Sequence, residues 1–107
     1  MSDTKHDSGK ARFDLLVPGF TEQMAKIMEF GTRKYTPNSW QSVANGTDRY
    51  TAALHRHMNA WQQGEDIDEE SGCSHLAHVA VNAMFLFHLK RQNKPSPYDD
   101  LFGGDYE

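Results

Sequence analysis

The sequence has little of what would place the protein outside the cytosol, in a membrane or on a nucleic acid. It has one cysteine, Cys73, in 107 residues, which excludes an internal disulfide and suits a reducing compartment. Its apolar runs fall short of the ~20 residues that span a bilayer, and residues 1–10 lack the apolar region of a signal peptide. The formal net charge of −4 gives no electrostatic basis for nucleic-acid binding. We therefore expect a soluble, cytoplasmic protein with no nucleic-acid and no membrane partner.

The length of the chain allows one domain with a modest core. Residues 1–9 are polar and lack periodicity, which predicts a disordered arm. Residues 10–93 carry the apolar periodicity and predict a helical domain, and residues 94–107 form an acidic C-terminal tail.

Three stretches predict helices, and no pair of strands is convincing. The first helix begins near Thr21, a plausible N-cap. The second runs from Thr47 or Asp48 to about Gln63, with Gly64 placed to end it. The third covers about 74–91 and ends in two basic residues before two prolines. The fold class is therefore all-α, with three main helices.

The third predicted helix is apolar nearly all round, which is typical of a buried helix. Three helices of this kind bury little as a monomer. We therefore expect a homodimer or a higher homo-oligomer that completes a four-helix or larger bundle.

A polar stripe interrupts this apolar helix. His75, His78 and Asn82 share one face at positions i, i+3 and i+7, directly after the acidic stretch 65–70. Burying them without partners would cost about 1–3 kcal/mol each. One interpretation is that acids and imidazoles converge on a divalent cation, or on the phosphates that it carries, through Glu65, Asp68, Glu70, His75 and His78. The alternative is a polar core whose groups are satisfied by hydrogen bonds.

Basic and aromatic residues elsewhere leave two further alternatives open. Residues 10–18 form either a strap that packs Phe13, Leu15 and Leu16 on the body or a segment whose Lys10 or Arg12 reaches a phosphate. Trp40, in the loop 35–46, either anchors that loop to the core or stacks on a base.

Several motifs in fixed order resemble one known family. The strings are KARFDLL (10–16), FGTRKYTPNSW (30–40) and RYTAALHRHMNAWQQGEDIDEESGCSHLAHVAVNAMFL (49–86). Together they resemble the bacteriophage dATP/dGTP diphosphohydrolase family, which is similar to the MazG-like all-α nucleotide pyrophosphatases. The resemblance covers about residues 10–90.

The resemblance implies metal-dependent hydrolysis of a purine deoxynucleoside triphosphate to the monophosphate and pyrophosphate. It also implies a MazG-like helical bundle completed by oligomerisation, and Mg²⁺ or Mn²⁺ as the cofactor. Residues 10–93 would then bind the nucleotide. Arginine and lysine suit phosphates, and aromatic rings suit a base, so the candidate nucleotide-binding residues are Lys10, Arg12, Lys34, Tyr35, Trp40, Arg49, Arg56 and Asn82. The candidate catalytic residues are Glu70, His57 and His78, and a histidine of this region would act as a ligand or a general base.

The sequence departs from the MazG-like pattern at the expected metal ligands. Those enzymes bind magnesium through Glu-x-x-Glu on one helix and Glu-x-x-Asp on the next, whereas this chain has Arg56, His57 and Asn59, then His75 and His78. Either the metal has moved to the acidic stretch, or catalytic metal binding has been lost. The rival hypothesis is a non-catalytic phage protein that binds and sequesters a host defence nucleotide signal. A third is a structural module for helical dimerisation.

Overall fold

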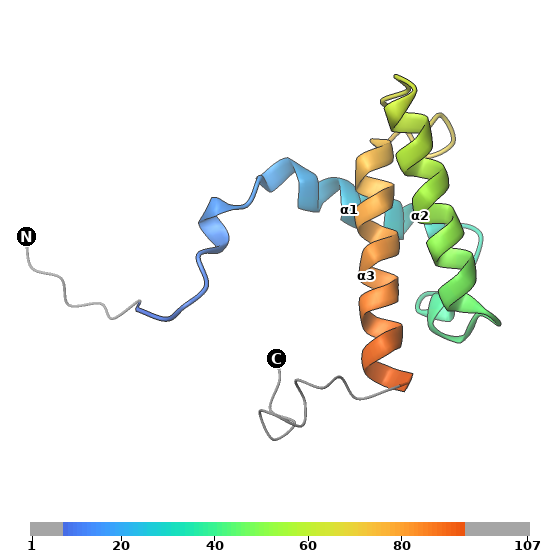
Figure 1. Cartoon of the computed structure of the whole chain (residues 1–107), viewed down its shortest axis with the longest axis horizontal. Helices are drawn as coiled ribbons and strands as arrows, with labels where there is room; N and C mark the ends of the chain where they lie inside the picture. Colours follow the sequence, from blue (N-terminus) through green and yellow to red (C-terminus); the bar gives the residue numbers. More distant parts are fainter. Residues whose placement is uncertain (1–7, 94–107) are drawn as a thin grey trace, which may run out of the picture.

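The computed structural model describes residues 8–93 and confirms the all-α class with three main helices (Figure 1). These are α1 (Pro18–Gly31), α2 (Gly46–Gln62) and α3 (His75–Asn93), with two short 3-10 helices, η1 (Phe13–Leu15) and η2 (Ser39–Ser42). Within 8–93 there is no β-strand, only an isolated bridge between Ile67 and Ser74. Most of the predicted N-terminal arm (1–9) and the whole predicted acidic tail (94–107) lie outside the described residues.

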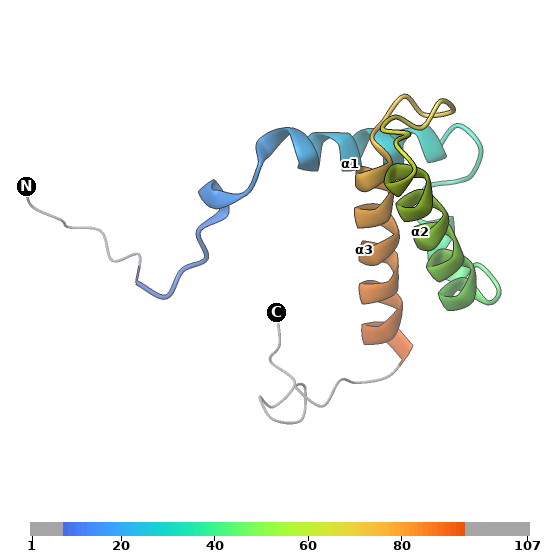
Figure 2. The ribbon, with the colours of Figure 1, turned by 45° about the horizontal axis from the view of Figure 1, so that its top comes forward.

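Helix α3 is the centre of the arrangement. It packs along α2, which runs antiparallel to it, and it also packs against α1, whereas α1 and α2 do not pack on one another (Figures 1 and 2). The buried core is small and consists of Ile27 from α1, Cys73 before α3, and Ala77 and Val81 from α3. Met24, Met28, Met84 and Phe85 pack against it. The predicted burial of α3 therefore holds on the faces that meet α1 and α2.

The helix ends follow local sequence signals. Helix α1 begins at Pro18 and not near Thr21, because proline at the first helical position has a suitable φ and needs no N–H partner. Helix α2 begins at Gly46, one residue before the predicted Thr47, after Asn45 in the left-handed region. Gly64 has φ of +100° and ends α2 as predicted. Ser74 caps α3, since its Oγ accepts the Leu76 N–H at 3.0 Å.

The expected packing of residues 10–18 on the body is wrong for the single chain. Residues 8–17 and the first half of α1 extend away from the α2–α3 pair (Figure 2). The side chains of Phe13, Leu15 and Leu16 are 76%, 72% and 59% exposed. The reason is that η1 leads almost directly into α1, and only the C-terminal part of α1 reaches α3. No helix within residues 8–93 is long and apolar enough to cross a membrane.

Candidate functional site

The site is built on the loop that joins α2 to α3, residues 63–74, which is folded tightly back on itself. The Asp68 N–H donates to the Cys73 carbonyl at 2.8 Å, and the His75 N–H donates to the Asp66 carbonyl at 2.9 Å. Helix α1 fixes the loop from outside, because Gln23 Oε1 accepts the Ser74 N–H at 2.7 Å. The acidic stretch is therefore held at the N-terminal end of α3 and next to the C-terminal half of α2.

Ser71 organises the first half of the polar cluster. Its N–H and its hydroxyl both lie within hydrogen-bond distance of Asp68 Oδ2, at 3.0 and 2.8 Å. The same hydroxyl lies 2.7 Å from His78 Nε2, and Asp68 Oδ2 lies 3.4 Å from that nitrogen. Asn82 continues the stripe, since its Nδ2 donates to the His78 carbonyl at 2.9 Å. The requirement that the buried stripe find partners is therefore met.

His57 from α2 and His75 from α3 form the second half of the cluster. Their Nδ1 atoms lie 2.8 Å apart. The other ring nitrogen of His75, Nε2, lies 3.0 Å from Glu65 Oε2, and His75 itself is buried. The His57 ring also stacks on His78, with centroids 4.2 Å apart and planes 10° from parallel.

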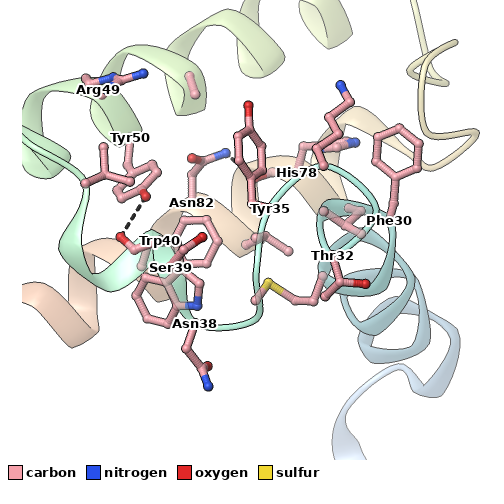
Figure 3. A pocket seen from close by; sticks show the side chains of 18 of the residues that line it. Phe30, Thr32, Tyr35, Asn38, Ser39, Trp40, Arg49, Tyr50, His78 and Asn82 are labelled. Atoms are coloured by element: carbon pink, nitrogen blue, oxygen red, sulfur yellow. Dashed lines mark hydrogen bonds between the residues drawn. The ribbon is translucent and has the colours of Figure 1, made fainter.

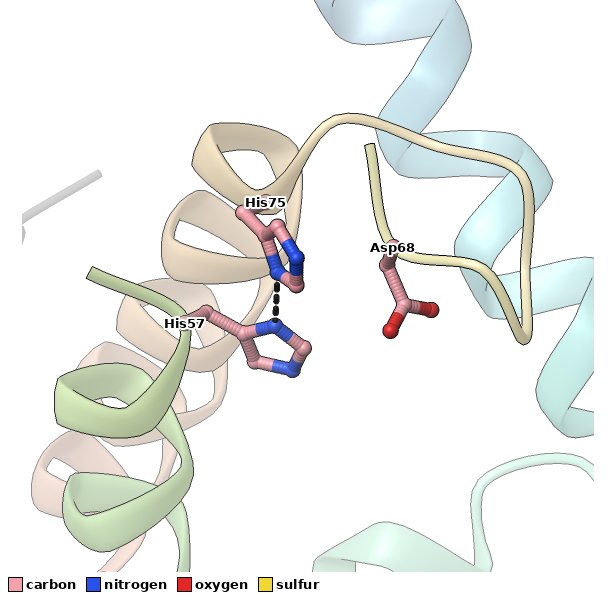
Figure 4. A group of neighbouring side chains, drawn as sticks. All are labelled: His57, Asp68 and His75. Atoms are coloured by element: carbon pink, nitrogen blue, oxygen red, sulfur yellow. Dashed lines mark hydrogen bonds between the residues drawn. The ribbon is translucent and has the colours of Figure 1, made fainter. Parts of the chain in front are cut away.

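Three of these side chains are close enough to share one ion. One ligand atom from each of His57, Asp68 and His75 lies within 4.8 Å of the other two (Figure 4). The predicted metal set thus converges in part, with Asp68 and His75 inside the group and His78 beside Asp68. Glu65 stands outside it, because it binds the far nitrogen of His75. Glu70 also stands outside it, because it forms an ion pair with Lys34.

The protonation states at the cluster suit ligand chemistry. Burial, together with the neighbouring His78 and His75, lowers the pKa of His57 from 6.5 to about 4. Burial also lowers the pKa of His78, against the opposing effect of Asp68. Burial raises the pKa of Asp68, but the hydrogen bonds from Ser71 and the neighbouring His78 and His57 together outweigh it, so this pKa lies below its ordinary value. At neutral pH His57 and His78 are therefore neutral and the carboxyl is ionised.

A cavity of about 650 Å³ lies next to this cluster, a size typical of small-ligand sites (Figure 3). Its walls come from the C-terminal end of α1, the α1–α2 linker, α2 and α3. Six of the eight predicted nucleotide-binding residues line it, and so does one predicted catalytic residue; they are Lys34, Tyr35, Trp40, Arg49, Arg56 and Asn82, together with His78.

Lys10 and Arg12 are not brought to this cavity. Arg12 lies in the exposed N-terminal segment and pairs with Asp14 at 2.7 Å, and neither residue lines the cavity. By contrast, Arg49 and Arg56 have no ion-pair partner within residues 8–93. The cations available to an anion in the cavity are therefore these two arginines and Lys34, which also contacts Glu70.

Trp40 is an anchor of the linker. Its ring stacks on Phe85 with centroids 4.4 Å apart, and its carbonyl accepts the Tyr50 hydroxyl at 2.7 Å. Its indole Nε1 is buried and has no hydrogen-bond partner among the described residues. This buried donor is therefore unsatisfied, whereas Tyr35, which is 67% exposed, is free to contact a ligand at the rim of the cavity.

Comparison with known proteins gives the family. The family model described as "dATP/dGTP diphosphohydrolase, N-terminal" matches residues 2–99. The chain belongs to this family. The chain is also 36% identical over 99 residues to a dATP/dGTP diphosphohydrolase of Salmonella phage PMBT28, a match that covers 92% of this chain and 33% of that protein. The chain therefore spans about a third of the length of this relative. No solved structure matches.

Sequence reasoning missed three residues that build the site. Ser71 positions Asp68 and His78, Gln23 ties α1 to the loop, and Tyr50 holds Trp40. The spacing Asp68-x-x-Ser71 is typical of a local side-chain turn and was a usable signal. Gln23 and Tyr50 act across long or medium sequence separations, for which the sequence carries no comparable pattern.

Proposed function

We propose that the cavity binds a purine deoxynucleoside triphosphate, such as dATP or dGTP, and that the protein hydrolyses it to the monophosphate and pyrophosphate with a divalent cation, Mg²⁺ or Mn²⁺. The observation that carries this proposal is the position of the cavity. The cavity is lined by two arginines that have no ion-pair partner in the described part of the chain. It lies next to a cluster of imidazoles and a carboxylate. The family and the name of the phage relative support the same substrate class.

The charges favour one orientation of the nucleotide. Lys34 and Arg56 lie at the end of the cavity near the cluster, since Lys34 interacts electrostatically with Asp68 and Arg56 lowers the pKa of His57. Arg49 lies two helical turns earlier on α2, about 10 Å away. The phosphates therefore lie toward Lys34 and Arg56, and the base lies toward Trp40, within reach of Arg49.

Cleavage of the triphosphate requires positioned cations and a water in line with the α-phosphorus. A bound divalent cation supplies charge neutralisation and a more acidic water. Of the candidate bases, His78 lines the cavity, and its lowered pKa keeps it neutral and able to accept a proton from that water. Glu70 forms an ion pair with Lys34. It therefore positions the Lys34 ammonium and does not touch the reacting atoms.

A second candidate function keeps the same pocket without turnover. The helices carry Arg56, His57 and Asn59 at the positions where the MazG-like pattern has magnesium-binding glutamates. A protein that only binds and sequesters a nucleotide signal needs the arginines and the aromatic wall but not those glutamates.

Product analysis separates the two functions. The purified chain is incubated with dATP, dGTP, dCTP or dTTP and Mg²⁺ or Mn²⁺, and products are resolved by anion-exchange chromatography. The proposal predicts dAMP or dGMP with one equivalent of pyrophosphate, and loss of most turnover in His78→Gln. Binding of the purine nucleotides without products would favour sequestration. Release of orthophosphate and a diphosphate would contradict the proposed reaction.

A further inference from the structure

Two of the three imidazoles in the cluster, those of His57 and His75, lie close enough to share a proton or a cation. His57 Nδ1 and His75 Nδ1 lie 2.8 Å apart, so two lone pairs cannot face one another there, and a proton or a cation must lie between them. Glu65 decides which nitrogen of His75 carries its hydrogen. An ionised carboxylate only accepts hydrogen bonds, so His75 Nε2, 3.0 Å from Glu65 Oε2, is the donor. The lone pair of His75 is then on Nδ1, directed at His57.

This arrangement is the one that proteins use around metal ions. A metal-binding histidine ordinarily donates its other N–H to a carboxylate or carbonyl, which fixes its tautomer and its orientation. Two imidazole nitrogens bound to one ion at about 2.1 Å lie about 3.0–3.4 Å apart. The observed 2.8 Å between the two Nδ1 atoms is only a few tenths of an ångström shorter. A small rotation of the partly exposed His57 ring therefore makes room for an ion.

Asp68 supplies the third ligand. One of its carboxylate oxygens lies within 4.8 Å of a ring nitrogen of both histidines, and the three side chains face one shared space (Figure 4). The N–H and hydroxyl of Ser71 hold this carboxylate through Oδ2. The three ligands come from α2, from the loop and from α3, so the fold itself keeps them together.

We propose that His57, His75 and Asp68 bind one transition-metal ion of the Mn²⁺, Co²⁺ or Zn²⁺ class in the absence of nucleotide, with Glu65 and Ser71 as positioning residues. Two imidazoles and one carboxylate suit these ions, whereas Mg²⁺ prefers ligand sets made of oxygen. Three protein ligands leave coordination positions open to water or to an anionic ligand. Resting on the proposed function, we assign an open position to a phosphate oxygen of the nucleotide, because His78 and Arg56 connect the cluster to the cavity wall.

Metal titration without nucleotide tests this site. Protein treated with a chelator and then desalted is titrated with Mn²⁺, Co²⁺, Zn²⁺ and Mg²⁺ by calorimetry, and the Co²⁺ complex is examined by visible absorption. The proposal predicts one ion per chain, a Co²⁺ spectrum typical of nitrogen ligands, and weaker binding of Mg²⁺ than of the three transition-metal ions. Bound ion should also raise Tm, since only the folded state holds the three ligands together.

Four substitutions locate the ion. His57→Gln and Asp68→Asn should each weaken binding by about 100-fold or more, and Glu65→Gln by about 10-fold, because outer-shell partners contribute less than ligands. His55→Gln, an exposed histidine two residues from His57 on α2, is the matched control and should bind normally. Circular dichroism confirms that each variant is folded.

The outcomes separate this inference from the proposed function. Absence of ion binding, or equal affinity in His57→Gln and the control, would overturn the metal site and leave a hydrogen-bonded histidine pair. Ion binding that appears only when dGTP is added would overturn it as well, while supporting the nucleotide site. Arg49→Ala should bind the ion with the affinity of the wild type even though it binds the nucleotide more weakly. The metal site is therefore tested independently of the nucleotide site.

Discussion

At the scale of single residues, the site depends on neutral imidazoles packed against one another. His57 stacks on His78 and contacts His75, and each positive charge placed there would repel the next. Arg56 adds to this effect, and Asp68 opposes it. Protonation of the histidines in the cluster therefore lowers the stability of the folded state.

We expect the metal-free protein to lose stability as the pH falls. His57 binds a proton with a pKa near 6.5 when unfolded but near 4 when folded. Between these pH values the unfolded state binds more protons than the folded state. The contribution of neutral His57 to the unfolding free energy is therefore fully present above about pH 6.5 and is lost as the pH falls toward 4. The lowered pKa of His78 acts in the same direction.

Urea denaturation in the presence of a chelator, from pH 8 to pH 4, measures this dependence. His57→Gln should show a shallower decline of the unfolding free energy over that range, and the exposed-histidine control His55→Gln should follow the wild type. An equally steep decline in His57→Gln would show that other groups cause it.

At the scale of elements, the sequence predicted the helices well and the loop poorly. Apolar periodicity, Gly64 and Ser74 fixed the three helices to within a few residues. The polar stripe of α3 and its need for partners were also correct. Which acid meets which histidine was not predictable, because the reversal of the loop at Ser71 and Gly72 selects Asp68 for the cluster and directs Glu70 to Lys34.

Gly64 provides a test at this scale. Its φ of +100° lies where side chains are strained, so Gly64→Ala should lower the unfolding free energy by about 1 kcal/mol or more. Gly31→Ala is the matched control, since Gly31 ends α1 without a positive φ and a Cβ there meets no atom within 4 Å. Chemical denaturation should show the control unchanged or slightly stabilised. Equal stability of both variants would contradict the role of Gly64 as the end of α2.

At the scale of the whole molecule, the protein combines a small core with many exposed apolar side chains. No large side chain among the described residues is fully buried, and Phe13, Leu15, Leu16, Val17 and Phe20 lie exposed along the N-terminal segment and the start of α1. Large apolar side chains exposed so close together in the sequence are typical of an interaction surface. The expected strap is thus present in the sequence, but one chain alone does not pack it.

We expect the segment to pack on a second copy of the chain. Multi-angle light scattering at micromolar concentration should then give a mass of at least twice the 12.2 kDa of the chain. Leu16→Glu should shift the mass toward that of the monomer, because the introduced carboxylate would be buried without a partner. Thr21→Glu, an exposed position on α1, is the control. A monomer mass for the wild type would rule out the homo-oligomer.

We expect the cavity between the α1–α2 linker, α2 and α3 to bind a purine nucleotide through its arginines. Isothermal titration of dGTP into the wild type, Arg49→Ala, Arg56→Ala and Lys26→Ala in the presence of Mn²⁺ tests it most directly. Loss of one charge-assisted hydrogen bond costs about 1.5–3 kcal/mol, or about 10–100-fold in Kd. Arg49→Ala and Arg56→Ala should each show such a loss, whereas Lys26→Ala should keep the wild-type Kd, because Lys26 lies exposed on α1. Equal affinity in all four proteins, or no binding by the folded wild type, would contradict it.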